Sequence, residues 1–265
     1  MAIGTSLNIG LNQVDPKQYG DYFDELEGCE NDARDMRALA AAQGFQTTLM
    51  LNNQAKSTAV TNKIKDAANQ LSGGDFFLLT YSGHGAQLIN ELNEDEESDG
   101  LDETWALFDR NLIDDELAVL WSQFQPDVRI LVISDSCHSG TFTRSFGRGR
   151  RSRGIRRRSQ QGRMIQFREI YDDIRRRLPN MRTLEIGASV LSLSACEDGQ
   201  SADDGVENGA FTAALLRIWD NAAFIGDYHR LYQLLLEENL GLQKPQISLT
   251  GSSNIPFMEQ RPFTI

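Results

Sequence analysis

The chain has 265 residues, of which 40% are hydrophobic, and a formal net charge of −12 at pH 7. This length and apolar content fit one α/β domain better than two. No apolar run approaches the about 18 residues of a membrane span, and the first residues lack a basic start followed by an apolar core, so we expect a cytoplasmic protein. The three cysteines, Cys29, Cys137 and Cys196, are unclustered, which argues against a disulfide framework or a zinc site.

The first half of the chain alternates strand and helix patterns, which predicts a parallel sheet. We expect strands at residues 6–12 and 45–51, and a third that runs from Phe76 into the glycines around His84. Helical spacing predicts a helix over residues 30–43, and another begins at Ser57. The expected caps are Asn31 or Asp32 for the first and Ser57 for the second; Gly44 should end the first, and the apolar stripe of the second is Val60, Ile64, Ala67, Ala68 and Leu71.

The second half begins with an acidic loop at residues 93–103, then a hairpin over 104–113 that turns at residues 109–111. Asp114 is placed to cap a helix over residues 116–123. The remaining pattern predicts strands at 130–133, 189–195 and 246–249, and helices at 165–178, 210–222 and 228–238.

Charge is distributed unevenly along the chain. Between Arg144 and Arg182 there are fourteen arginines against three acidic residues, whereas the remainder carries 12 basic and 35 acidic residues. The glycines, serines and charges of residues 145–162 bury too little apolar area to order a loop of this length, so we expect mobility there. The basic segment and the acidic remainder should attract each other unless salt screens them.

Two apolar strands end at residues with catalytic chemistry. The run at 130–133 is too short and too β-branched for a helix and breaks into the polar residues that precede Cys137, while the strand from Phe76 breaks into glycines around His84. Ligands of open α/β sheets bind beyond the carboxyl ends of strands, so both side chains are expected in one crevice. Cys137 and His84 are therefore a candidate nucleophile and base.

These residues stand in motifs that resemble those of a known family. Tyr-Ser-Gly-His-Gly at residues 81–85 and Asp-Ser-Cys-His-Ser-Gly at 135–140 are similar to the histidine and cysteine motifs of metacaspases, specifically the prokaryotic orthocaspases. Residues 26–33 and 209–212 are similar to the first helix and the small-subunit helix of that family. The match spans nearly the whole chain, and the 53 positions from His84 to Cys137 agree with the roughly 50 of caspases. The Gln-Ala-Cys motif of animal caspases is absent, and separase-like or gingipain-like relatives match less well.

The resemblance implies an α/β fold of the caspase-like sandwich type, with helices on both faces of a central, mostly parallel sheet. It implies a single peptidase domain over residues 1–265. Residues 1–143 would form its large-subunit-like part, 144–182 the arginine-rich insertion and 183–265 the small-subunit-like part.

Peptide cleavage by a thiol needs a base, because a thiol of pKa about 8.5 is mostly protonated at neutral pH. We assign Cys137 as the nucleophile, His84 as its base, and the backbone N–H groups of Gly85 and Cys137 as the oxyanion hole. Two alternatives stay open. Cys137 could be a small buried residue at a strand end, and His138 is a rival base, although adjacent side chains usually point in opposite directions.

The residues before the nucleophile indicate which substrate is cleaved. Asp135 should point to the same side of the strand as Cys137 and make the crevice acidic, which selects arginine or lysine at P1 and disfavours aspartate. The resemblance implies that Asp135, Asp32, Cys29 and Ser82 together line this S1 pocket. Alternatively, Asp32 caps its helix, Cys29 only packs and Ser82 only completes a turn. Asp198 and Asp203 either flank the substrate strand or are loop charge.

In an arginine-selective protease, the arginine-rich segment would be an internal substrate tethered next to the nucleophile at high effective concentration. We expect it to occupy the pocket as a brake and to be cut between Arg144 and Arg182. The rival interpretation is a patch that binds nucleic acid or membrane; we disfavour it because the acidic remainder of the chain should hold the segment intramolecularly.

Calcium is where the sequence departs from its relatives. Asp99, Asp114 and Asp115 resemble three of the four aspartates that many metacaspases use, but the fourth aligns with Arg144, and a cation there weakens a Ca²⁺ site. We therefore expect that no cofactor is required and that calcium is dispensable. These aspartates are equally explained as solvated loop charge and a helix cap.

The sequence thus predicts a monomeric cysteine endopeptidase that acts on polypeptides with a basic P1 residue and on its own arginine-rich segment, without membrane or nucleic-acid partners. Two other classes remain open: a regulatory pseudo-protease locked by the insertion, and a scaffold that binds nucleic acid or acidic partners through its arginines.

Overall fold

The computed structural model describes residues 1–20, 23–89, 101–136, 151–152, 170–195, 203–238, 240–241, 243–252 and 255–265. Only the backbone is described for residues 87, 89, 101, 151, 152, 203 and 204. Within these ranges, no helix is both long enough and apolar enough to cross a membrane.

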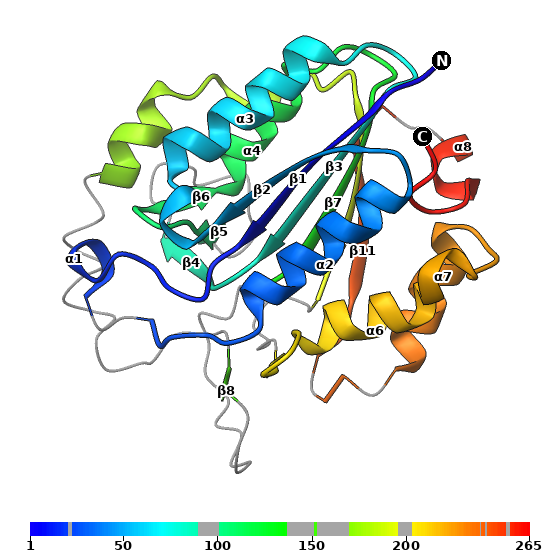
Figure 1. Ribbon diagram of the computed structural model, residues 1–265. Helices are drawn as coiled ribbons and strands as arrows, with labels where there is room; N and C mark the ends of the chain where they lie inside the picture. Colours follow the sequence, from blue (N-terminus) through cyan, green and yellow to red (C-terminus); the bar gives the residue numbers. More distant parts are fainter. Residues whose placement is uncertain are drawn as a thin grey trace.

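A six-stranded sheet forms the centre of the molecule (Figure 1). Its strand order is β11-β9-β7-β3-β1-β2, in which every neighbouring pair is parallel except β11 with β9. The parallel strands confirm the predicted α/β class. The bounds are β1 (Gly4–Gly10), β2 (Gln46–Leu51), β3 (Phe76–Ser82), β7 (Arg129–Asp135), β9 (Ser189–Ser194) and β11 (Gln246–Gly251).

Helices cover both faces of this sheet and enclose two apolar cores. The helices on one face are α2 (Cys29–Ala42), α6 (Ala210–Trp219), α7 (Tyr228–Glu237) and α8 (Ile255–Glu259). The opposite face carries α3 (Ser57–Gln70) and α4 (Asp114–Trp121). In β7 the split follows the strand period of two, since Leu131 and Ile133 lie in the first core while Ile130 and Val132 lie in the second.

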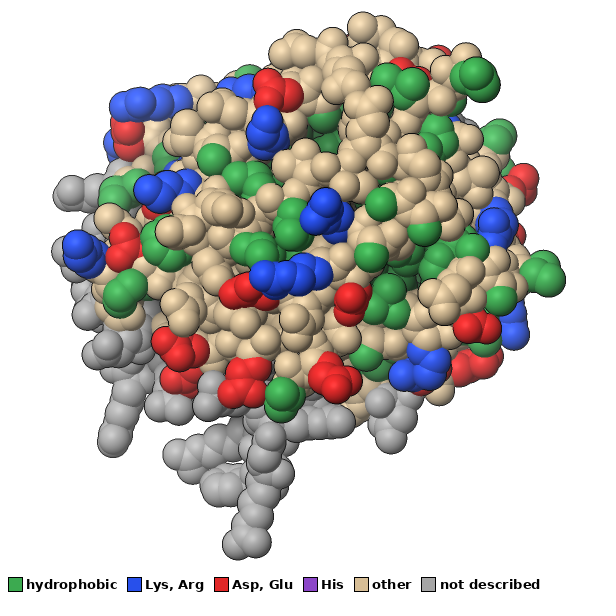
Figure 2. Space-filling model, in the orientation of Figure 1, with side chains coloured by type: hydrophobic (Ala, Val, Ile, Leu, Met, Phe, Trp, Pro, Cys, Tyr) green, Lys and Arg blue, Asp and Glu red, His purple; other side chains and the backbone are tan. Residues whose placement is uncertain are grey.

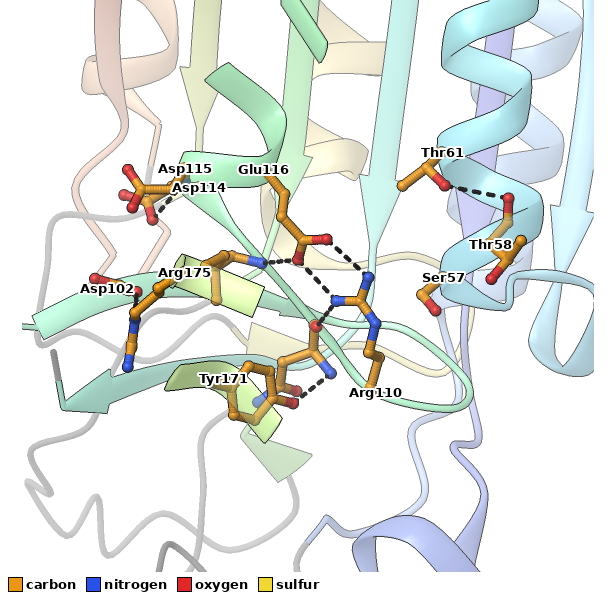
Figure 3. Close-up of polar contacts among 12 residues, drawn as sticks. Ser57, Thr58, Thr61, Asp102, Arg110, Asp114, Asp115, Glu116, Tyr171 and Arg175 are labelled. Atoms are coloured by element: carbon orange, nitrogen blue, oxygen red, sulfur yellow. Dashed lines mark hydrogen bonds and ion pairs between the residues drawn. The ribbon is translucent and has the colours of Figure 1, made fainter. Parts of the chain in front are cut away.

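A small antiparallel sheet lies beside the main sheet, at the carboxyl ends of its parallel strands (Figure 1). It comprises β4 (Gly85–Ile89), β5 (Leu101–Ala106) and β6 (Asn111–Ile113). The helix over residues 170–177 packs against it: Arg175 forms a buried ion pair of 2.8 Å with Asp102, and the Tyr171 hydroxyl accepts from the backbone N–H of Asn111 at 2.9 Å (Figure 3). The other described elements are α1 (Pro16–Tyr19), β8 (Arg151–Ser152), β10 (Asp203–Asp204) and the short 3-10 turns Asn52–Gln54, Met181–Thr183 and Asp220–Ala222.

The predicted apolar stripe of α3 is confirmed, but the predicted N-caps of α2 and α3 are wrong. All five stripe residues of α3 are buried, yet Ser57 is the first helical residue rather than the cap. Its N–H and hydroxyl both donate to the Asp109 carboxylate, at 2.6 and 3.1 Å, so a side chain from the β5–β6 turn caps this helix. The cap of α2 is Gly28, and Asn31 and Asp32 lie inside the helix.

Other boundaries differ from the prediction. The helix at Asp114 starts at that residue instead of after it, because Ile113 is the cap. Strand β1 begins two residues earlier than predicted, and β4 and α1 were not predicted at all. The predicted hairpin over 104–113 is confirmed by the antiparallel pairing of β5 with β6, and Gly44 follows α2 with a positive φ of 89°. The part of the predicted helix before residue 170 lies outside the described residues.

Candidate active site

The carboxyl ends of β3 and β7 bring Ser82 and Asp135 side by side. The two residues are register partners in the parallel ladder, at the last position of each strand. By the alternation along both strands, their side chains lie on the face that α2 and α6 cover. Both are buried, so the polar end of each strand lies under helices rather than in solvent.

Asp32 joins three elements at this position. Its side chain projects from the first turn of α2 and is 1% exposed. One carboxylate oxygen accepts from the Ser82 hydroxyl at 2.6 Å, and the other accepts from the backbone N–H of Gly209, the cap of α6, at 2.9 Å. Asp32 therefore links α2, β3 and α6 through charge-assisted hydrogen bonds.

Asp135 contacts the same end of α6. One of its carboxylate oxygens accepts from the backbone N–H of Thr212 at 3.0 Å and from the Thr212 hydroxyl at 2.7 Å. The N-terminus of a helix carries partial positive charge and unpaired N–H groups, which stabilise carboxylates. Two buried acidic side chains, Asp32 and Asp135, thus share one helix N-terminus and create an acidic region beside the ends of β3 and β7.

The backbone around His84 is held by Tyr81. The Tyr81 hydroxyl lies 2.7 Å from the His84 carbonyl oxygen and 3.0 Å from that of Ala106, and the Ala106 N–H donates to the His84 carbonyl at 2.9 Å. The Tyr81 ring stacks on Trp105 at 4.5 Å. A side chain at Gly83 would approach the Tyr81 hydroxyl to 2.6 Å, so glycine is required there for this arrangement.

The imidazole of His84 is 1% exposed and is held by the loop before α2. Its Nε2 lies 2.7 Å from the backbone carbonyl oxygen of Asp24, and the Phe23 ring stacks on it with centroids 4.5 Å apart. A carbonyl oxygen only accepts hydrogen bonds, so this contact requires the proton of the neutral ring on Nε2. The lone pair is then on Nδ1, which is the nitrogen that would take a proton from a nucleophile.

Of the other sequence-predicted residues, the structure describes Gly85 and Cys29 close to this site. Gly85 directly follows His84 and begins β4, paired with Trp105. Cys29 is fully buried at the start of α2, and its carbonyl group packs against Gly10, where an added side chain would come within 2.3 Å of the Cys29 oxygen. Outside the described residues lie Cys137, His138, Asp99, Asp198, Cys196 and most of the segment from Arg144 to Arg182.

Asp114 and Asp115 lie at the start of α4, where the Asp115 N–H donates to the Asp114 carboxylate at 3.0 Å (Figure 3). In the part of the chain that the structure describes, no three or more His, Cys, Asp or Glu side chains are arranged to hold a metal ion. The third candidate, Asp99, is not among those residues.

Sequence reasoning missed Phe23, Asp24, Gly209 and Thr212 as members of this site. Asp24 and Gly209 act through backbone groups, which any residue type supplies, so composition carries no signal for them. Thr212 is 77 positions from Asp135, and its role depends on where α6 begins. The motif at 209–212 was the one available indication, because Gly-Ala-Phe-Thr at a helix start leaves N–H donors at the helix end.

Comparison with solved structures defines the class of protein. Protein GSU0716 of Geobacter sulfurreducens superposes with a TM-score of 0.88 at 42% identity, covering 99% of this chain and 98% of that one. Caspase-1 of Spodoptera frugiperda superposes with a TM-score of 0.54 at 13% identity, covering 94% and 86%. The fold is therefore the predicted caspase-like α/β sandwich.

The family follows from the sequence comparisons. The caspase domain model (Peptidase_C14) matches residues 14–261, so the chain belongs to the caspase-domain family of cysteine peptidases, among the metacaspases. Metacaspase-4 of Arabidopsis thaliana is 38% identical over 142 residues, covering 50% of this chain and 32% of its own. Metacaspase-1 of Mycosarcoma maydis is 27% identical over 291 aligned residues, covering 92% and 69%. The chain spans about a third of the length of the plant metacaspases it matches.

Proposed function

We propose that the chain is a cysteine endopeptidase that hydrolyses peptide bonds after arginine, and also after lysine. The observation that carries the specificity is the pair of buried carboxylates, Asp32 and Asp135, at the N-terminus of α6, one of them two residues before Cys137. A carboxylate has about four lone-pair positions, so it can hold its present partners and still accept from a guanidinium. An aspartate at P1 would bring like charges together.

The chemistry follows from the state of His84. Nδ1 takes the thiol proton of Cys137, and the resulting thiolate attacks the scissile carbonyl carbon while the backbone N–H groups of Gly85 and Cys137 stabilise the oxyanion. The tetrahedral intermediate expels the amine, which takes the proton from the imidazolium. Water, deprotonated by His84, then hydrolyses the thioester and releases the acid. Asp24 supports this proposal because its carbonyl oxygen keeps the ring in the required tautomer.

Self-processing within the arginine-rich segment is part of the proposal. The described part of that segment includes β8, which pairs antiparallel with β10, Ser152 opposite Asp203 and Arg151 opposite Asp204. This pairing supports the hypothesis that the segment lies along a strand of the small-subunit-like part as a substrate would. Arg175 is excluded as the cleaved residue because it is buried in its ion pair, whereas Arg176 and Arg177 are exposed.

Hydrolysis of matched fluorogenic peptides that end in arginine, lysine or aspartate tests the proposal. We expect turnover of the arginine peptide, less of the lysine peptide and none of the aspartate peptide, with full loss in Cys137→Ala. Turnover should persist in EDTA, because calcium is proposed to be dispensable. Stimulation of more than about tenfold by millimolar calcium, abolished by Asp114→Ala, would contradict that part.

Mass spectrometry of the purified protein tests self-processing. Nicks after arginine are expected in the wild type and absent in Cys137→Ala. If no peptide is cleaved, even after trypsin nicks the segment, a regulatory pseudo-protease becomes the better description; a thiol probe that labels Cys137 would count against that description.

A further inference from the structure

We propose that Phe23 is a positioning residue for the His84 base. The Phe23 ring holds the imidazole in one plane, and in that plane the Asp24 carbonyl fixes the Nε2–H tautomer. The inference rests on the proposed function only where it predicts an effect of Phe23 on catalysis. Its structural part, the control of the imidazole, stands independently.

Two consecutive residues restrain the ring of His84 in different directions. The Phe23 ring lies nearly parallel to it, at an interplanar angle of 20° and a centroid separation of 4.5 Å, which blocks tilting out of the plane. The Asp24 carbonyl meets Nε2 at 2.7 Å, which fixes the edge that faces the loop. A hydrogen bond alone leaves the ring free to tilt, and a stack alone does not select a tautomer, so the two contacts together define one orientation.

Phe23 is itself in contact with a second aromatic ring, that of Tyr19. The Tyr19 ring meets Phe23 edge-on at 5.1 Å, and the buried Tyr19 hydroxyl donates to the Leu107 carbonyl at 2.8 Å. Burial raises the pKa of Tyr19 well above its ordinary value, so this hydroxyl remains a donor. The series Tyr19, Phe23 and His84 is thus anchored to the turn between β5 and β6.

The loop that carries Phe23 and Asp24 is fixed by Asn12. The Leu26 N–H donates to the Asn12 carbonyl at 2.9 Å, and the Asn12 side chain donates to the Glu27 carbonyl and accepts from the Glu30 N–H, each at 2.9 Å. These bonds fix the chain that directly follows Phe23 and Asp24, at the start of α2.

Packing of an apolar core does not account for Phe23. Its side chain is only half-buried, and among the described residues it belongs to none of the three apolar clusters. Its ring contacts include the edge of Tyr19 and the face of His84, a polar ring that forms a cation when it takes a proton, and an aromatic face attracts a cation.

The test compares Phe23→Leu, which removes the aromatic face, with Phe23→Tyr, which retains it. Phe108→Leu is the matched control. Phe108 is also half-buried, but it packs against the apolar core on the face of the sheet that α3 and α4 cover. The first readout is ¹⁵N NMR of the imidazoles, with three histidines in the chain and His84→Ala to assign the signal. We expect an Nε2–H tautomer in the wild type, Phe23→Tyr and Phe108→Leu, and a mixture of tautomers in Phe23→Leu.

The second readout is the hydrolysis of the arginine peptide. Phe23→Leu should lower kcat by about 10- to 100-fold with KM changed less than about twofold, because misplaced catalytic groups slow the chemical step without altering the S1 pocket. Phe23→Tyr should restore kcat. If Phe23→Leu does not fold, by circular dichroism, Phe23→Met takes its place with the same expected results.

An unchanged His84 signal and unchanged kcat in Phe23→Leu would overturn the inference, as would an equal loss of kcat in Phe23→Tyr. A wild type that cleaves no peptide would refute the proposed function alone, since the NMR comparison would still decide the role of Phe23.

Discussion

Thr212 gives the buried Asp135 carboxylate two donors, its backbone N–H and its hydroxyl. Replacing it by valine keeps the shape and the backbone N–H but removes the hydroxyl that donates to Asp135 at 2.7 Å. A hydrogen bond to a charged group contributes about 1.5 to 3 kcal/mol, so Thr212→Val should lower the free energy of unfolding by that amount in urea titrations. It should also lower kcat/KM for the arginine peptide.

Thr61→Val is the control for this change. The Thr61 hydroxyl donates to the neutral Thr58 carbonyl at 3.2 Å near the surface of α3 (Figure 3), so its loss should cost less than about 0.5 kcal/mol. Equal stabilities of Thr212→Val and the wild type would show that Asp135 does not need the Thr212 hydroxyl.

Among the elements, the helix over residues 170–177 depends on one guanidinium. Arg175 pairs with Asp102 at 2.8 Å and with Asp172 at 3.2 Å, and its side chain is 5% exposed. Removing one partner of a buried ion pair leaves an uncompensated charge and costs about 3 to 5 kcal/mol. Arg175→Met should therefore release this helix, which hydrogen exchange of its amides would detect, and Arg175→Met with Asp102→Leu should recover most of the loss.

The same helix provides the control pair. Arg177 and Asp173 also form an ion pair, at 2.7 Å, but their side chains are 77% and 54% exposed. Arg177→Ala should leave the hydrogen exchange of the helix amides unchanged. It should change the free energy of unfolding by no more than about 1 kcal/mol. Exchange that is as slow in Arg175→Met as in the wild type would show that the apolar contacts of Tyr171, Ile174 and Leu178 suffice for docking.

The elements also show how far the sequence could be interpreted. Periodicity identified α2, α3, β3 and β7, because their buried faces repeat every 3.6 or 2 residues. Strand β4 was missed because it has only five residues and begins in the glycine-containing motif around His84, which is typical of a loop. The N-cap of α3 was predicted wrongly for a different reason. Asp109 lies 52 positions from Ser57, and only the tertiary fold brings it to the start of α3.

The same distinction applies to the candidate site. His84, Asp32, Asp135 and Ser82 could be singled out from motifs, and the structure places Asp32 against Ser82 and Ser82 beside Asp135 at the ends of β3 and β7. Their partners do not follow, because the backbone groups of Asp24, Gly209 and Thr212 are set by where a loop and a helix begin.

For the whole molecule, acid stability should depend on Asp75 at the amino-terminal end of the sheet. Burial alone would raise the pKa of Asp75, but hydrogen bonds from the Ile3 N–H and from the N–H and hydroxyl of Ser72 outweigh it, so the pKa lies below its ordinary value. A lowered folded-state pKa stabilises the fold above the unfolded-state value of about 3.9, and this stabilisation is lost as pH falls through the folded-state pKa.

Asp75→Asn should therefore be less stable than the wild type by about 1 to 3 kcal/mol at pH 7, with the difference shrinking below about pH 4. Urea unfolding of both proteins across this range measures it. A difference that is constant with pH would show that the carboxylate charge is not what the three donors stabilise.

Cleavage of the arginine-rich segment should leave the molecule in one piece. Strand β9, which follows the segment, lies between β7 and β11, and six register pairs join it to β7, which precedes the segment. A nicked sample should elute as a single species of unchanged size in gel filtration and separate into two fragments only under denaturing conditions. Two species in the native column would mean that the sheet does not survive the cut.

The N-terminus of α6 also has a consequence for synthesis on the ribosome. The donors that hold Asp32 and Asp135 are Gly209 and Thr212, which are translated well after His84, Cys137 and the whole arginine-rich segment. A nascent chain that has not yet emerged to Thr212 lacks these donors and holds its two carboxylates without them. The order of translation thus delays assembly of the acidic region until residues 209–212 have emerged.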